Sequence, residues 1–149
     1  MTQTGRIESL TGKWAPLSNF HKESHGKTAE HIFQAAKTDD KAERAHVLSR
    51  EKPGQAKYAG KRVTLRKDWE ETKEGFMEEI LRRKFQDLSL RKLLDETGDA
   101  EIVEGNRWHD NFWGQCTCGK RAKCNPGQGK NTLGNLLMKI REENRRSAR

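Results

Sequence analysis

The chain has 149 residues, of which 32% are hydrophobic and 35% charged, so it fits one domain with a single modest core. Its net charge of +8 and pI near 9.6 favour a polyanionic partner such as nucleic acid or a phosphate-bearing ligand, although an ordinary basic protein without such a partner is an equal alternative on charge alone. No apolar run approaches the ~18 residues of a membrane span, the N-terminus lacks a signal-peptide core and the cysteines number three, so we expect a cytoplasmic protein with no membrane association.

The first half of the chain predicts a turn-rich opening and then a series of short helices. The opening holds at most one short strand, near residues 7–10, because it contains glycine, proline and asparagine, which favour turns. Thr28 is a good N-cap for a helix with an apolar stripe. The aspartates at 39–40 restart a helix through Leu48, and Pro53 suits the first turn of a short third helix.

The middle of the chain contains the clearest helical pattern. Asp68 is a good cap, and the apolar residues that follow recur on one helix face through Phe85. Ser89 is expected to cap the next helix and Gly98 to end it. A short strand is compatible with residues 100–104. The fold class that these patterns predict is mainly α.

A long loop and a closing helix complete the predicted elements. The loop, residues 105–130, is rich in glycine, asparagine and tryptophan. Asn131 can cap a helix with a leucine-rich inner stripe, and the arginine-rich tail from Arg141 is expected to fray. We therefore expect a single domain over residues 1–149, with about five N-terminal and about eight C-terminal residues frayed.

Two charged residues on the first predicted helix form a candidate catalytic pair. Glu30 and Lys37 are seven residues apart, close to two helical turns, so they share one face with Gln34. Long helical side chains lean toward the helix N-terminus, which lets the Lys37 ammonium approach the Glu30 carboxylate. Such a pair can do acid–base or nucleophilic work, or it can be a plain surface ion pair.

The long loop supplies a second candidate cluster. Asp110 lies between Trp108 and Trp113, where an apolar wall would perturb its pKa and a base or sugar could stack. Lys130 and Asn131 follow a glycine at the start of the last helix, where free backbone N–H groups can bind phosphate. The alternatives are a loop cap for Asp110 and ordinary core packing for Trp113.

The same loop contains all the cysteines of the chain: Cys116, Cys118 and Cys124. A structural zinc usually takes four ligands paired as Cys-x-x-Cys, and Cys116 and Cys118 are closer together than that. A fourth ligand would have to come from His109 or elsewhere. We therefore predict free thiols and no metal, with a zinc or redox role as the alternative. The basic neighbours of the cysteines are consistent with a phosphate-contacting lip or with a solvated loop; they are Lys120, Arg121 and Lys123.

Several motifs, taken in chain order from about Pro16 to Arg141, resemble the NADAR family, also called the YbiA-like family. They occupy residues 16–20, 30–37, 66–69, 84–86, 97–104, 110–114, 129–134 and 137–141. The resemblance implies a compact, mainly helical single domain with at most short strands, and no cofactor. It also implies N-glycosidic hydrolysis. Members remove ADP-ribose from guanine in nucleic acid, some as antitoxins to DarT-type ADP-ribosyltransferases, and others are described as cleaving riboflavin-pathway intermediates.

Carried over residue by residue, the resemblance implies catalytic roles for Glu30, Lys37 and Asp110. With the spacing arguments above, it gives ten predicted substrate-binding residues: Ser18, Asn19, Phe20, His31, Gln34, Trp69, Trp113, Gly114, Lys130 and Asn131. The implied partner is nucleic acid carrying guanine-linked ADP-ribose, with a DarT-type toxin by association. The chain departs from the family in the short stretch between Phe20 and Glu30, which lacks an aromatic-Pro-Thr lead-in, and in the long loop after Gly114 that carries the cysteines. Lys67 also stands as an insertion between Arg66 and Asp68.

The implied chemistry leaves two routes and two rival functions open. Glu30 either orients a water against an oxocarbenium-like sugar or takes a proton from a ribose hydroxyl. In the second case the ring opens and Lys37 captures the aldehyde as a Schiff base. The rival functions are an N-glycosidase acting on riboflavin-biosynthesis intermediates and a non-catalytic module that binds ADP-ribose or nucleic acid.

Overall fold

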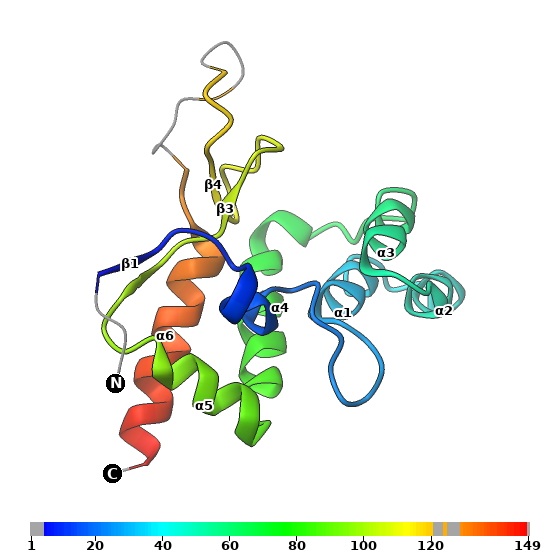
Figure 1. The fold of residues 1–149 in the computed structure, drawn as a ribbon. Coiled ribbons are helices and arrows are strands. Elements are labelled where there is room, and N and C mark those ends of the chain that lie inside the picture. Colours follow the sequence, from blue (N-terminus) through cyan, green and yellow to red (C-terminus); the bar gives the residue numbers. More distant parts are fainter. Residues whose placement is uncertain (1–4, 121–123, 125–128, 149) are drawn as a thin grey trace. The chain divides into compact units, whose positions relative to one another are not determined.

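The structure is a computed structural model that describes residues 5–120, 124 and 129–148 (Figure 1). These residues form two compact units. Unit 1 combines the N-terminal segment up to Leu17 with the chain from Phe85 onward, and unit 2 comprises Ser18–Lys84. The described residues are mainly helical and every strand is two residues long, which confirms the predicted fold class. No helix among them is long and apolar enough to cross a lipid bilayer.

Unit 2 consists of four helices that follow one another in the chain. They are α1 (Ala29–Ala35), α2 (Lys41–Ser49), α3 (Pro53–Gly60) and α4 (Trp69–Lys84). Helix α1 contacts each of the other three, so it is the central element of the unit. The predicted caps are confirmed for the first two helices. The Thr28 hydroxyl accepts the backbone N–H of His31, and the Asp40 carboxylate accepts that of Glu43.

Small residues bring the helices of unit 2 close together. Ala35 of α1 packs with Val47 of α2 and with Ala56 and Ala59 of α3. A β-carbon at Gly60 would lie 2.0 Å from the Gln34 side-chain oxygen, so α1 and α3 approach closely here and a larger residue would displace the Gln34 side chain. This close approach positions α1, the helix that carries Glu30 and leads into the turn with Lys37.

Unit 1 joins short strands to two longer helices. Its elements are β1 (Arg6–Ile7), the 3-10 helix η1 (Gly12–Leu17), α5 (Leu88–Glu96), β2 (Glu101–Ile102), β3 (Gly105–Asn106), β4 (Gln115–Cys116) and α6 (Thr132–Ser147). Strand β1 pairs in parallel with β2, and β3 pairs in parallel with β4 (Figure 1). The leucine stripe predicted for the last helix is buried, as expected.

Two helix ends in unit 1 differ from the prediction. Asp87, not Ser89, caps α5, because its carboxylate accepts the backbone N–H groups of Ser89 and Leu90. Helix α6 continues through Ser147, where the sequence predicts a frayed tail. The guanidinium of Arg145 binds the carboxylates of Asp95 and Asp99, which holds the last turns of α6 in place. Residues 1–4, part of the predicted N-terminal fraying, lie outside the described residues.

The cap of α6 also works differently from the prediction. Asn131 begins the helix in a left-handed conformation with φ 53°, and its side chain makes no capping hydrogen bond. Instead the side-chain oxygen accepts the backbone N–H of Glu104, and the side-chain nitrogen donates to the carbonyl of Ile102. The residue therefore ties α6 to strand β2 and the segment after it.

Candidate active site

Glu30 is a buried carboxylate on the first turn of α1, with 7% of its surface exposed. The side-chain amide of Gln34 donates a 2.6 Å hydrogen bond to its carboxylate. Its own backbone N–H donates to the carbonyl of Asn19 at 3.0 Å. A buried charge of this kind is costly unless hydrogen bonds satisfy it, so the Gln34 amide both stabilises and orients the carboxylate.

Lys37 lies in the turn that follows α1 and is half-buried. Burial lowers the pKa of its ammonium, and the nearby Glu30 carboxylate acts in the opposite direction. Three further ammonium groups lower the same pKa; they belong to Lys57, Lys61 and Lys73. Glu30 is therefore close enough to Lys37 to act on its charge, as the predicted shared face requires. The lowered pKa gives Lys37 more free amine at neutral pH than an exposed lysine has.

The segment before α1 supplies the first three predicted binding residues. Asn19 is buried, its side-chain nitrogen lies 3.5 Å from the Met77 sulfur, and its side-chain oxygen has no partner among the described residues. The Ser18 hydroxyl accepts the backbone N–H of Phe20, whose ring is largely exposed. Asn19 thus brings an unpaired hydrogen-bond acceptor to the start of the Glu30 helix.

Two other predicted binding residues lie in the interior of unit 2. The Nδ1 atom of His31 is hydrogen-bonded to Thr28 and its Nε2 atom lies 2.7 Å from the carbonyl of Arg50. Trp69 packs between Phe33 and Phe76, with ring centroids 5.1 and 6.0 Å away. Both side chains hold α1 against its neighbouring helices, and their roles toward a substrate stay predictions.

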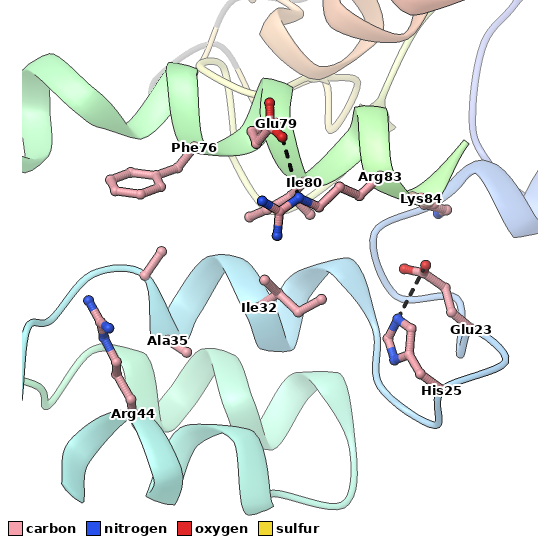
Figure 2. Close-up of a pocket in the computed structure, with 11 residues that line it drawn as sticks. Glu23, His25, Ile32, Ala35, Arg44, Phe76, Glu79, Ile80, Arg83 and Lys84 are labelled. Atoms are coloured by element: carbon pink, nitrogen blue, oxygen red, sulfur yellow. Dashed lines mark hydrogen bonds and ion pairs between the residues drawn. The ribbon is translucent and has the colours of Figure 1, made fainter. Parts of the chain in front are cut away.

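A groove of about 570 Å³ lies between α1 and α4 in unit 2 (Figure 2). Its walls are largely apolar, with Ile32 on one side and Phe76 and Ile80 on the other. Helical geometry places Ile32 on the face of α1 opposite Glu30, and the described lining includes none of the predicted site residues. The groove and the Glu30 face are therefore separate features of unit 2.

Lys84, at the end of α4, is a buried amine that the sequence predicted only as part of the 84–86 motif and to which it assigned no role. It occupies a position on the apolar stripe of the helix, since it follows Met77 by seven residues and Ile80 by four. Burial lowers its pKa to about 8, against the opposing charge of Glu23. Its ammonium donates a 2.8 Å hydrogen bond to the carbonyl of Ser18. A lysine on an apolar helical stripe was the signal available in the sequence.

The lowered pKa of Lys84 predicts a specific dependence of stability on pH. The unfolded chain holds this proton up to about pH 10.4, whereas the folded chain releases it near pH 8. Between these values the unfolded state binds more protons, so the free energy of unfolding gains a contribution as pH rises. We expect the free energy of unfolding of Lys84→Met to lack this increase when urea unfolding at about pH 7 is compared with urea unfolding at about pH 10. The control is Lys41→Met on an exposed position of α2. Equal pH slopes for wild type and Lys84→Met would contradict the assignment.

In unit 1, Asp110 organises the turn that presents Trp113. Its carboxylate accepts the backbone N–H groups of Phe112 at 3.1 Å and Trp113 at 2.9 Å. Its backbone carbonyl accepts the side-chain amide of Asn106 at 2.8 Å. The rings of Phe112 and Trp113 meet edge to face at 4.8 Å. One carboxylate oxygen of Asp110 therefore serves as a loop cap, and a catalytic role for the residue stays a prediction.

Gly114 and Lys130 complete the predicted set in unit 1. A β-carbon at Gly114 would lie 2.0 Å from the carbonyl oxygen of Glu104, so no other residue fits there without a shift of the backbone. The Lys130 ammonium lies 5.4 Å from the ring centroid of Phe112. Arg121 and Lys123, suggested as part of a phosphate-contacting lip, lie outside the described residues.

The comparisons with known proteins define the family. A model of the NADAR domain matches residues 7–145, so the chain belongs to the NADAR domain family. The N-glycosidase YbiA of Escherichia coli strain K12 is 40% identical over 119 residues, which are 78% of this chain and 69% of that protein. The N-glycosidase Npun_R5314 of Nostoc punctiforme is 34% identical over 145 residues, which are 87% of each chain.

Two further matches extend the comparison. The riboflavin biosynthesis protein VVA0006 of Vibrio vulnificus is 35% identical over 119 residues, which are 78% of this chain but only 30% of that protein. The solved NMR structure of E. coli YbiA superposes with a TM-score of 0.80 at 34% identity, covering 99% of this chain and 89% of that one. Together the relatives support an N-glycosidase, a hydrolase of glycosidic bonds, on a YbiA-like fold.

Proposed function

We propose that this protein is an N-glycosidase that removes ADP-ribose from guanine in nucleic acid. The observation that carries the proposal is the pairing of a buried carboxylate, Glu30 of α1, with an amine of lowered pKa, Lys37 in the turn that follows the helix. A carboxylate suffices for cleavage of a sugar–nitrogen bond through an oxocarbenium-like state, and a neutral amine beside it permits the alternative route through an opened ring. The N-glycosidase names of several relatives point to the same bond type.

The geometry supports two routes to the same products. In the first, Glu30 takes a proton from a water that adds to the anomeric carbon, while the departing guanine nitrogen keeps the bonding electrons and gains a proton. In the second, Glu30 takes a proton from a ribose hydroxyl as the furanose opens: the ring oxygen leaves the anomeric carbon and gains a proton, and the guanine nitrogen forms a C=N bond to that carbon. The free amine of Lys37 then adds to the same carbon, and guanine departs with a proton as its bond to the sugar breaks, which leaves a Schiff base on Lys37. Hydrolysis of that Schiff base then releases the sugar and restores Lys37.

The charge around the pair supports an anionic substrate. Lys57, Lys61 and Lys73 all act on the Lys37 ammonium, so several positive charges surround the candidate site within unit 2. The diphosphate of ADP-ribose and the backbone of a nucleic acid both suit such surroundings. The unpaired acceptor of Asn19 is suited to a ribose hydroxyl. Reversal of a DarT-type modification, as an antitoxin, is the cellular role that this substrate implies.

A second candidate substrate is a riboflavin-biosynthesis intermediate, which the name of the Vibrio vulnificus relative suggests. The same carboxylate and amine would cleave its N-glycosidic bond. That small molecule has no need of an extensive basic surface, so the net charge of +8 favours the nucleic-acid substrate. A non-catalytic binding module is the remaining alternative, and it requires neither Glu30 nor Lys37 to be reactive.

The direct test is to incubate the full chain with an oligonucleotide that carries ADP-ribose on guanine. We expect release of ADP-ribose with recovery of the unmodified oligonucleotide, measured by mass spectrometry. Longer oligonucleotides should react faster at low salt, and this advantage should fall as salt is added. Turnover of the riboflavin intermediate alone would select the second candidate, and salt-sensitive binding without any product would select the binding module.

Borohydride trapping distinguishes the two chemical routes. If Lys37 forms a Schiff base, reduction during turnover should leave a covalent sugar adduct on that residue, and Lys37→Arg should abolish the adduct. Because the attacking amine must be neutral, the trapped fraction should rise with pH through the lowered pKa of Lys37. Lys41→Arg, an exposed lysine of the same unit, should leave trapping unchanged. Turnover without any adduct would exclude the Schiff-base route and leave the water route.

A further inference from the structure

The loop of unit 1 gathers one histidine and all three cysteines of the chain into a single cluster. The ligand atoms of His109, Cys116, Cys118 and Cys124 all lie within 4.8 Å of one another. The cysteines are free thiols, and the 3.2 Å between the sulfurs of Cys118 and Cys124 exceeds the ~2.05 Å of a disulfide. Three sulfurs and one imidazole nitrogen therefore converge on one point without a covalent bond between them.

The distances from the imidazole nitrogen to the three sulfurs match those around a tetrahedral zinc ion, and the 3.2 Å between the sulfurs of Cys118 and Cys124 would have to widen slightly on binding. Zinc bonds of about 2.3 Å to sulfur and about 2.05 Å to nitrogen, at tetrahedral angles, place a nitrogen and a sulfur ligand about 3.6 Å apart. The Nδ1 atom of His109 lies 3.5 Å from the Cys118 sulfur, 3.7 Å from that of Cys116 and 3.5 Å from that of Cys124. The imidazole nitrogen is thus placed to complete, with the three sulfurs, the four ligands of one zinc ion.

The backbone explains how a spacing of two residues can supply a ligand pair. Cys116 ends strand β4, and residues two apart on an extended chain direct their side chains to the same side. Gly119 then turns the chain with φ 75°. The backbone N–H of Cys118 donates to the Cys116 sulfur, and that of Lys120 donates to the Cys118 sulfur, at 3.4 and 3.3 Å. Amide donors of this kind stabilise thiolates.

We propose that His109, Cys116, Cys118 and Cys124 bind one Zn²⁺ as a closed structural site. Three thiolates and an imidazole are the donors that zinc prefers in such sites, and the full set of four ligands leaves no open position for catalysis. The ion would fasten the loop directly beside Asp110 and the turn that presents Trp113. The expectation of free thiols relied on the usual Cys-x-x-Cys spacing, which the extended strand makes unnecessary.

Metal analysis of the full chain tests this proposal without any activity assay. Protein produced without a histidine tag and passed through gel filtration should retain one zinc per chain by plasma mass spectrometry. Replacement by Co²⁺ should produce the thiolate-to-cobalt charge-transfer bands and the intense visible bands of tetrahedral coordination. Absence of retained zinc together with absence of the cobalt bands would overturn the proposal. Because both measurements use the wild-type chain, they do not depend on whether a variant folds.

Ligand variants identify the residues that hold the ion. Loss of a second-shell partner weakens zinc binding about 10–100-fold, so loss of a ligand in His109→Asn or Cys118→Ser should weaken it by more than about 100-fold. All the cysteines belong to the cluster, so the matched control is His46→Asn on an exposed position of α2, which should keep full zinc affinity. Unchanged affinity in His109→Asn and Cys118→Ser would overturn the assigned ligand set.

Discussion

Replacing Glu30 by glutamine should lower the turnover of ADP-ribosylated substrate by about 10²- to 10⁴-fold, the usual contribution of a positioned acid or base. The amide has the shape of the carboxylate, and its oxygen can still accept the hydrogen bond from Gln34. The variant loses the negative charge that withdraws a proton in either route. Single-turnover kinetics of product release, alongside equilibrium binding of the same oligonucleotide, would measure the effect.

The control for this variant is Glu74→Gln on an exposed position of α4. It removes the same charge from unit 2, so it separates a local effect of Glu30 from a general change in electrostatics. We expect wild-type turnover from Glu74→Gln, and nearly unchanged substrate affinity and melting temperature from Glu30→Gln. Wild-type turnover by Glu30→Gln would remove Glu30 from the mechanism. Lost turnover accompanied by a lower melting temperature would show a structural effect instead.

Replacing Gly114 by alanine should destabilise the protein by about 1–3 kcal/mol, the usual cost of forcing extra atoms into a filled site. The added carbon would lie 2.0 Å from the carbonyl oxygen of Glu104 and 2.8 Å from the side-chain nitrogen of Asn106. A backbone carbonyl paired in the loop cannot move aside as a flexible side chain can. Each kcal/mol lowers the melting temperature by about 2–4 °C for a protein of this size, so thermal unfolding would detect the change.

Gly75→Ala is the matched control, and its expected effect has the opposite sign. Gly75 lies inside α4, and a β-carbon there meets no atom within 4 Å. Alanine is favoured over glycine in a helix interior by about 0.8–1.0 kcal/mol, so this variant should be more stable than wild type. Equal stability of Gly114→Ala and wild type would mean that the segment from Glu104 to Gly114 yields more readily than its close packing implies.

The sequence was most informative where structure depends on local chemistry. The caps at Thr28 and Asp40, the helical start at Pro53 and the apolar stripe after Asp68 all follow from side chains within a few residues of the helix ends. The contact of Gln34 with Glu30 is equally local, since it needs only the helical repeat, whereas the helix ends at Ala35 and Lys37 follows in a turn. These features were therefore predictable before any tertiary contact was known.

Features that depend on distant partners were not predictable in the same way. The side chain of Asn131 forms hydrogen bonds with the backbone of Ile102 and Glu104 instead of capping its own helix. Both residues lie far from Asn131 in the sequence, so local patterns do not reveal these bonds. The order of the tail after Arg141 depends on two carboxylates that are distant in sequence, Asp95 in α5 and Asp99 just after it. The cysteine cluster depends on an extended conformation at Cys116 that the motif spacing alone does not reveal.

The parallel pairing of β1 with β2 has a consequence for how the chain folds during synthesis. Residues 18–84 separate the N-terminal segment of unit 1 from the remainder of that unit, and β1 has no partner until Glu101–Ile102 emerges from the ribosome. All four helices of unit 2 have by then been translated, and the contacts of α1 with the other three lie within residues 29–84. We therefore expect unit 2 to fold before unit 1 on the nascent chain. Until Glu101–Ile102 has been translated, the strand Arg6–Ile7 lacks the strand with which it pairs.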